Sequence, residues 1–121
     1  MTLNRTALLV TTLLLAAAGQ ATAHAIPRSA EPAAGSILAA APAEVVIVFT
    51  ERLEGNFSGL EVRDQAGLRI DRGDAHLDPR DASRLSVGLP PLPPGTYKVT
   101  WHAVSVDTHR TEGAYEFTIR P

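Results

Sequence analysis

Apolar and polar residues alternate along most of the chain after residue 23, and this pattern predicts β-strands. Residues 45–49 form a nearly continuous β-branched run, which is typical of an interior strand. Residues 59–64 and 84–87 alternate, as half-buried strands do, because successive side chains of a strand point to opposite faces. After a Gln-Ala-Gly turn, a further short strand is expected at residues 68–70.

The two clearest strands lie at residues 96–104 and 114–119, and residues 105–113 are expected to form the loop that connects them. Within each strand the large apolar side chains fall on one face. We expect three aromatic side chains of these strands, Tyr97, Trp101 and Phe117, to lie in the core. His102 follows Trp101 and is expected to point outward.

Short strands bounded by Gly, Pro and Asp clusters at regular spacing indicate an all-β fold. We predict a Greek-key, immunoglobulin-like β-sandwich or barrel of about seven strands. The chain contains no Cys, so the disulfide of true immunoglobulin domains is absent and the similarity to them is architectural.

The first 23 residues have the pattern of a secretory signal peptide. Arg5 gives a positive start, residues 7–18 an apolar stretch, and Ala21-Thr22-Ala23 a small-residue cleavage site. The apolar stretch is shorter than the about 20 residues that a membrane-spanning helix needs. We therefore predict a cleaved signal peptide at residues 1–23 and one mature, exported domain at residues 24–121.

Composition limits the partners of this mature domain. It has 98 residues with 10 basic and 13 acidic side chains, because Arg5 is the one charged residue in the signal peptide. A net charge of −3 argues against nucleic acid and anionic membranes as partners, and no later segment is expected to span a membrane. No nucleophile–base pair stands out, so we expect a binding protein and no enzyme. We also expect this protein to be a monomer.

The mature domain has no sulfur ligand for a metal, since Cys is absent and the single methionine is Met1. Any metal site must use nitrogen and oxygen ligands, which excludes a sulfur-based Cu(I) site. Cleavage after Ala23 would make His24 the first residue, and its α-amine and imidazole Nδ1 could then chelate one ion.

A second candidate feature is Asp107-Thr108-His109, between the two clearest strands. On extended backbone, Asp107 and His109 would lie on one side of the chain and could converge on one ion. Amine, imidazole and carboxylate together suit tetragonal Cu(II). Each feature also has an ordinary alternative, because His24 could belong to a frayed terminus and Asp107 could cap a turn.

With these features the mature chain resembles the CopC-like periplasmic copper-binding proteins almost from end to end. The resemblance implies a small Greek-key β-barrel or sandwich. It also implies a Cu(II) site made by the amine and imidazole of His24, the imidazole of His109 and Asp107, with Glu51 supporting the N-terminus. The segments that carry the resemblance are His24, residues 29–35, 41–43, 48–51, 57–59, 94–101 and 104–109, Gly113 and Phe117.

The resemblance further implies a carrier or buffer of Cu(II) that acts in copper homeostasis and resistance. Its partner would be an inner-membrane copper transporter or an outer-membrane copper protein. Some members carry a Met- and His-rich loop for Cu(I), but residues 64–79 contain no Met and only His76, so we expect a Cu(II)-only member. Two other classes stay open: a metal-free immunoglobulin-like interaction module, and a copper oxidase of polysaccharides with an N-terminal His ligand.

Overall fold

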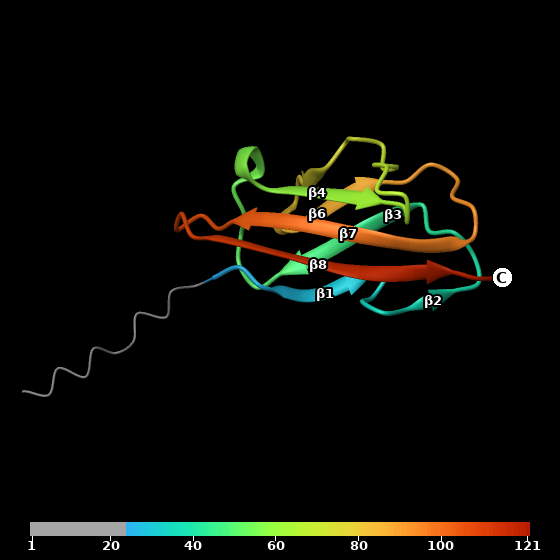
Figure 1. Cartoon of the computed structure of the whole chain (residues 1–121). Coiled ribbons are helices and arrows are strands. Elements are labelled where there is room, and N and C mark those ends of the chain that lie inside the picture. The colour runs from blue at the N-terminus through green and yellow to red at the C-terminus, as the bar shows by residue number, and fades with distance from the viewer. Residues whose placement is uncertain (1–23) are drawn as a thin grey trace, which may run out of the picture.

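The computed structural model describes residues 24–121, which form two four-stranded β-sheets packed face to face (Figure 1). The first sheet has the order β1-β3-β6-β5 and the second β2-β8-β7-β4. Neighbouring strands pair antiparallel except β2 and β8, which pair parallel. The elements are β1 (Pro27–Glu31), β2 (Ile37–Leu38), β3 (Glu44–Phe49), the 3₁₀ helix η1 (Gly55–Phe57), β4 (Gly59–Arg63), β5 (His76–Asp78), β6 (Asp81–Gly88), β7 (Gly95–Val104) and β8 (Arg110–Ile119).

These two sheets confirm the predicted all-β sandwich, and the described residues contain eight strands. β8 begins at Arg110, so residues 110–113 belong to the strand and the predicted loop is too long. The predicted strand at residues 68–70 is reduced to a single antiparallel bridge, between Arg69 and Arg63. Ile70 donates its N–H to the carbonyl oxygen of Val62 (2.9 Å), but Val62 donates its own N–H to the carboxylate of Asp71. Because a side chain replaces the next backbone acceptor, the ladder stops there.

The core lies between the sheets and contains the predicted aromatic residues. Tyr97, Trp101 and Phe117 are only 4%, 8% and 1% exposed. Phe49 meets Trp101 edge to face with ring centres 5.2 Å apart, and Tyr97 stacks on Phe117 at 5.5 Å. Such pairs favour a single side-chain arrangement beyond simple apolar burial. The aliphatic part of the core is Val45, Ile47, Leu53, Leu60, Val62, Leu85, Val87, Leu89, Val99, Ala103 and Ile119, with Ala25 at its edge.

Gly113 allows β8 to pass close to the indole ring of Trp101. The two residues are paired across β7 and β8. A Cβ atom at position 113 would lie 2.6 Å from Cζ2 of the indole, closer than real Cβ atoms come to other heavy atoms. The ring therefore occupies the space that a side chain at position 113 would need, which explains a glycine in the middle of a strand.

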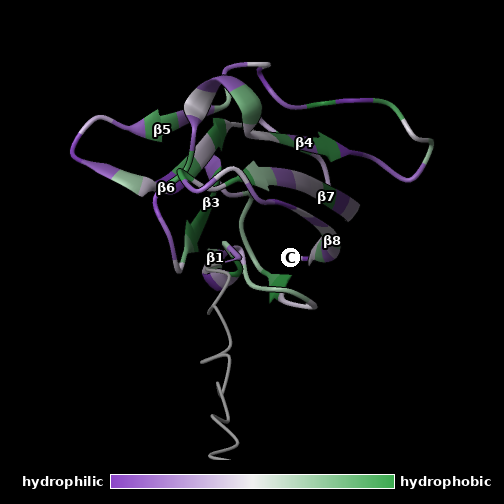
Figure 2. Cartoon of the chain, turned by 90° about the vertical axis from the view of Figure 1, so that its left-hand side faces the viewer, coloured by the Kyte–Doolittle hydropathy of each residue, from purple (hydrophilic) through white to green (hydrophobic). Residues whose placement is uncertain are grey.

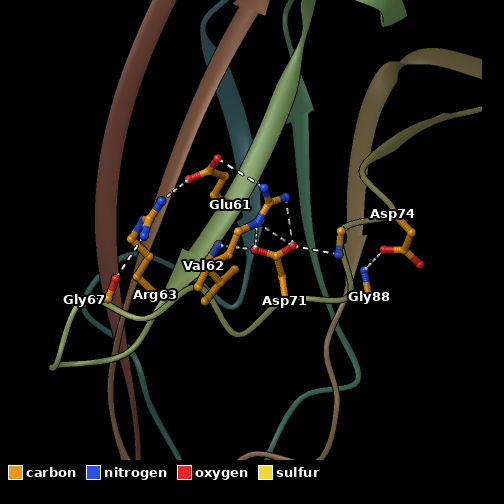
Figure 3. A network of polar contacts seen from close by, with 9 residues as sticks. Glu61, Val62, Arg63, Gly67, Asp71, Asp74 and Gly88 are labelled. Atoms are coloured by element: carbon orange, nitrogen blue, oxygen red, sulfur yellow. Dashed lines mark hydrogen bonds and ion pairs between the residues drawn. The ribbon is translucent and has the colours of Figure 1, made fainter.

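A buried carboxylate holds the connection between β4 and β5 (Figure 3). The side chain of Asp71 has no exposed surface and accepts hydrogen bonds from the backbone N–H groups of Val62 (2.9 Å) and Gly73 (2.8 Å). Arg69 pairs with Asp71 at 3.0 Å and with Glu61 at 3.3 Å. Burial alone would raise the pKa of Asp71, but the hydrogen bonds from Arg69 and the two backbone groups outweigh it, so the pKa is lowered.

Hydrophilic residues gather in the connecting loops, and hydrophobic positions recur along the strands (Figure 2). Within residues 24–121, no helix has the length and apolar character needed to cross a membrane. The predicted signal peptide, residues 1–23, lies outside the described residues.

Asp71→Asn is expected to lower the free energy of unfolding by about 2 kcal/mol at neutral pH, because the buried donors lose a charged acceptor. The lowered pKa means that Asp71 stabilises the fold above the unfolded-state pKa near about 4, and that this stabilisation is lost as the pH falls through the folded-state pKa. Urea unfolding at a series of pH values measures both effects, with the exposed Glu116→Gln as control. If the loss of unfolding free energy in Asp71→Asn does not become smaller in acid, the stabilising role of the ionised Asp71 is contradicted.

Gly113→Ala is expected to destabilise the protein by about 1–3 kcal/mol, because the indole of Trp101 must move away from the new Cβ. Trp101 is the only tryptophan, so its emission should shift to longer wavelength as the ring becomes more exposed. Gly55→Ala is the matched control, since its Cβ would lie an acceptable 3.4 Å from Cδ1 of Leu77. Equal stability and emission of the two variants would show that the close approach is unimportant.

Candidate metal centre

The connection between β7 and β8 is a tight turn. The N–H of Thr108 donates to the carbonyl oxygen of Ser105 (2.8 Å), and the N–H of Ser105 donates to that of His109 (3.0 Å). Thr108 has a φ of 75°, in the left-handed region that non-glycine residues rarely adopt. The expectation that Asp107 and His109 share one side of extended backbone is therefore wrong. The turn itself brings the two side chains together.

The carboxylate of Asp107 points back into this turn. Its Oδ1 accepts hydrogen bonds from the hydroxyl of Ser105, a buried residue, and from the backbone N–H of His109 (3.3 Å). The hydrogen bond from Ser105 is the largest cause that lowers the pKa of Asp107 below its ordinary value, and the backbone N–H and the nearby imidazole of His109 add to it. The carboxylate is therefore ionised at neutral pH and can serve as an oxygen ligand.

His109 presents a nitrogen that lacks a hydrogen-bond partner. Its Nδ1 lies 3.2 Å from Oδ1 of Asp107, but the two groups are not aligned as a hydrogen bond. Within residues 24–121 this buried nitrogen has no other partner, although 43% of the side chain as a whole is exposed. An unpartnered buried nitrogen is costly, and a bound metal ion would remove that cost.

His24 lies beside His109 although the two are far apart in the sequence. Their ring centres are 5.0 Å apart and the ring planes meet at 78°. Two imidazoles that share one ion through bonds of about 2 Å have ring centres roughly 4.5–6.5 Å apart. The fold thus brings together two of the predicted ligands, His24 and His109, and places the third, Asp107, against His109.

The described residues do not contain a closed metal site. In the chain from residue 24 to 121, no three His, Asp or Glu side chains converge closely enough to hold an ion. The remaining predicted ligand is the α-amine of His24, which forms only on cleavage after Ala23. The described arrangement is therefore two imidazoles side by side with a carboxylate against one of them, which is compatible with a nitrogen and oxygen site for Cu(II).

Glu51 lies in the bend that follows β3 and is half-buried. Its neighbour Thr50 donates a hydrogen bond from Oγ1 to the carbonyl oxygen of His24 (3.4 Å). Glu51 is therefore at the same end of the sandwich as His24, and its support of the N-terminus stays a prediction. The other histidines do not join this group: the ring of His102 covers Gly59 of β4, and His76 lies in β5.

Sequence reasoning missed three hydroxyl groups at this end of the sandwich. Ser105 bonds to Asp107, Thr50 bonds to His24, and Thr111 donates from Oγ1 to the carbonyl oxygen of Ala25 (2.6 Å). A Ser two residues before an Asp is a local turn signal that could have indicated the first of these contacts. Thr50 and Thr111 reach the N-terminus only through the folded arrangement of the strands.

Comparison with known proteins shows the same fold and family along most of the chain. The family model of the CopC domain matches residues 27–120. Protein YobA from Escherichia coli K12 is 38% identical over 99 residues, which are 81% of this chain and 80% of YobA. Copper resistance protein C from Escherichia coli is 33% identical over 130 residues, covering 99% of this chain and 100% of that protein. Copper transport protein CutJ from Bacillus subtilis is 34% identical over 98 residues, covering 80% of this chain and 18% of CutJ.

Solved structures are similar as well. The crystal structure of CopC from Methylosinus trichosporium OB3b has a TM-score of 0.76 at 32% identity, covering 81% of this chain and 95% of that chain. PcoC from Escherichia coli, described as a methionine-rich copper resistance protein, has a TM-score of 0.72 at 32% identity, covering 81% of this chain and 100% of that chain. The fold, the matched domain and these relatives together show that the chain belongs to the CopC family.

Proposed function

We propose that this protein is a periplasmic carrier that binds one Cu(II) ion at its mature N-terminus and acts in copper homeostasis and resistance. The observation that carries the proposal is the position of His24 beside His109, with ring centres 5.0 Å apart. The proposed ligands are the α-amine and imidazole of His24, the imidazole of His109 and the carboxylate of Asp107, with Glu51 supporting the N-terminus. Relatives named copper resistance protein C support copper as the cargo.

The donor atoms favour Cu(II) over Cu(I). Cu(I) prefers thiolate and thioether sulfur, whereas imidazole, amine and carboxylate suit Cu(II). The chain has no Cys, and its single methionine, Met1, belongs to the predicted signal peptide. PcoC, at 32% identity, is by contrast described as methionine rich. This difference supports a carrier with a Cu(II) site alone.

The proposed site is open enough for exchange of its ion with another molecule. The side chains of His109 and Asp107 are 43% and 38% exposed. The negative charge of Asp107 also lies against His109, where it would offset part of the charge of the ion. An exposed site supports reversible carriage over a permanent structural role. The four proposed protein ligands would leave little room at the ion for a substrate, which supports carriage over catalysis.

Two features support the cellular setting. The predicted signal peptide would direct export of the domain, and its cleavage after Ala23 would create the amine ligand. The match to copper transport protein CutJ covers 80% of this chain and only 18% of CutJ, so a domain like this one forms part of a larger copper transport protein. We propose that this monomeric carrier exchanges copper with an inner-membrane copper transporter or an outer-membrane copper protein.

Protein that begins at His24 is expected to bind one equivalent of Cu(II). His109→Ala removes a proposed ligand and is expected to weaken Cu(II) binding more than about 100-fold. Loss of a residue that only supports a ligand costs roughly 10- to 100-fold. Competition titration with a Cu(II) chelator measures the affinity. Electron paramagnetic resonance should show fewer coupled nitrogens in the variant.

His102→Ala is the matched control, because it also removes one imidazole but from the outer face of β7. It should bind copper as the unsubstituted protein does. Equal effects of the two substitutions would place the site elsewhere, and no copper binding by the unsubstituted protein would favour a metal-free interaction module.

A further inference from the structure

The first residues of the predicted mature chain are held more firmly than a chain end usually is. Ala25 is completely buried and belongs to the core, although His24 before it and Ile26 after it are exposed. Chain ends generally fray unless contacts hold them down. Here the second residue of the mature chain is a core residue, so the position of His24 depends on whatever holds Ala25.

Thr50 holds this segment from the side of the first sheet. Its Oγ1 accepts a hydrogen bond from the N–H of Ile26 (3.1 Å) and donates one to the carbonyl oxygen of His24 (3.4 Å). Its backbone N–H donates to the carbonyl oxygen of Ile26 (2.9 Å). One residue therefore bonds to the main chain on both sides of Ala25.

Thr111 holds the same segment from the side of the second sheet. Its Oγ1 donates to the carbonyl oxygen of Ala25 at 2.6 Å, in a partly buried contact. Thr111 lies in β8, where it pairs with Ala103 of β7, and it is two residues from His109. The start of β8 thus holds the N-terminus. It also directly follows His109, the residue beside which His24 lies.

We propose that Thr50 and Thr111, here called the threonine clasp, are positioning residues that fix the N-terminus between the two sheets and hold the imidazole of His24 beside that of His109 before copper binds. This inference rests on the proposed function, because it assigns the clasp to the same Cu(II) site. Neither threonine needs to touch the ion. The clasp acts by removing the conformational freedom that the N-terminal chelate would otherwise lose on binding.

The principal test is Thr111→Val, which preserves the shape of the side chain and removes the hydroxyl that bonds to Ala25. Cu(II) affinity is expected to fall about tenfold because the freed N-terminus must be ordered on binding. Thr111→Ser keeps the hydroxyl and should restore most of the affinity. Thr118→Val is the matched control on the same strand, because Thr118 contacts Thr96 instead of the N-terminus.

A second readout uses the metal-free protein. Amide hydrogen exchange at Ile26, whose N–H bonds to Thr50, should quicken roughly tenfold in Thr111→Val, while exchange at Ile47 in the core stays unchanged. A residue that acted only on overall stability would change both amides together. This measurement separates local positioning from a general loss of folding.

The outcomes are distinguishable. Weaker copper binding by Thr111→Val, rescue by Thr111→Ser and faster exchange confined to the N-terminus would support the clasp. Equal affinity of Thr111→Val and the unsubstituted protein would overturn it while the proposed function stands. An equal loss in Thr118→Val would also overturn it, and no copper binding by the unsubstituted protein would overturn both proposals.

Discussion

The antiparallel pairing of β7 with β8 is the interaction on which both the core and the candidate metal centre depend. It runs through ten residue pairs, from Gly95 with Ile119 to Val104 with Arg110. Its inward face contributes Trp101 to the core, and its turn carries His109. A slip by one residue would exchange the two faces of a strand, which would remove the indole from the core and alter the turn. One register therefore determines both the stability of the sandwich and the geometry of the site.

The two ends of the sandwich carry different chemistry. One end gathers imidazoles and a carboxylate around the β7–β8 turn. β4 begins near the β7–β8 turn and ends at the opposite end of the sandwich, where the connection to β5 starts. There the ion pairs of Arg69 with Glu61 and Asp71 tie this connection to the sheet (Figure 3). Some CopC-like proteins have a Met- and His-rich loop in this connection, whereas residues 64–79 here contain one His and no Met. Charged side chains thus hold the loop without soft metal donors, which agrees with the single Cu(II) site that we propose at the opposite end.

The sequence pattern predicted the parts of this structure that follow from local alternation. The positions of most strands and the aromatic core around Trp101 were predictable, because side chains alternate along a strand and the large apolar ones must be buried. Residues 68–70 were mispredicted because the deciding contact, Val62 to the side chain of Asp71, is specific to the folded loop. The Asp-x-His pair was expected on extended backbone, but a left-handed Thr108 produces the convergence instead. The threonine clasp could not be predicted from the sequence for a similar reason, since Thr111 and Ala25 come into contact only in the assembled sheets.

If the N-terminal residue itself binds copper, as we propose, binding must depend on a free α-amine at His24. Cu(II) titration and electron paramagnetic resonance of two purified forms test this dependence. One form begins at His24, and the other carries one additional Ala before it. The first form is expected to bind copper tightly and stoichiometrically, with nitrogen hyperfine structure. The second is expected to bind copper much more weakly, because the amine is displaced from the imidazole. Equal binding by both forms would contradict the N-terminal chelate and place the copper site elsewhere in the domain.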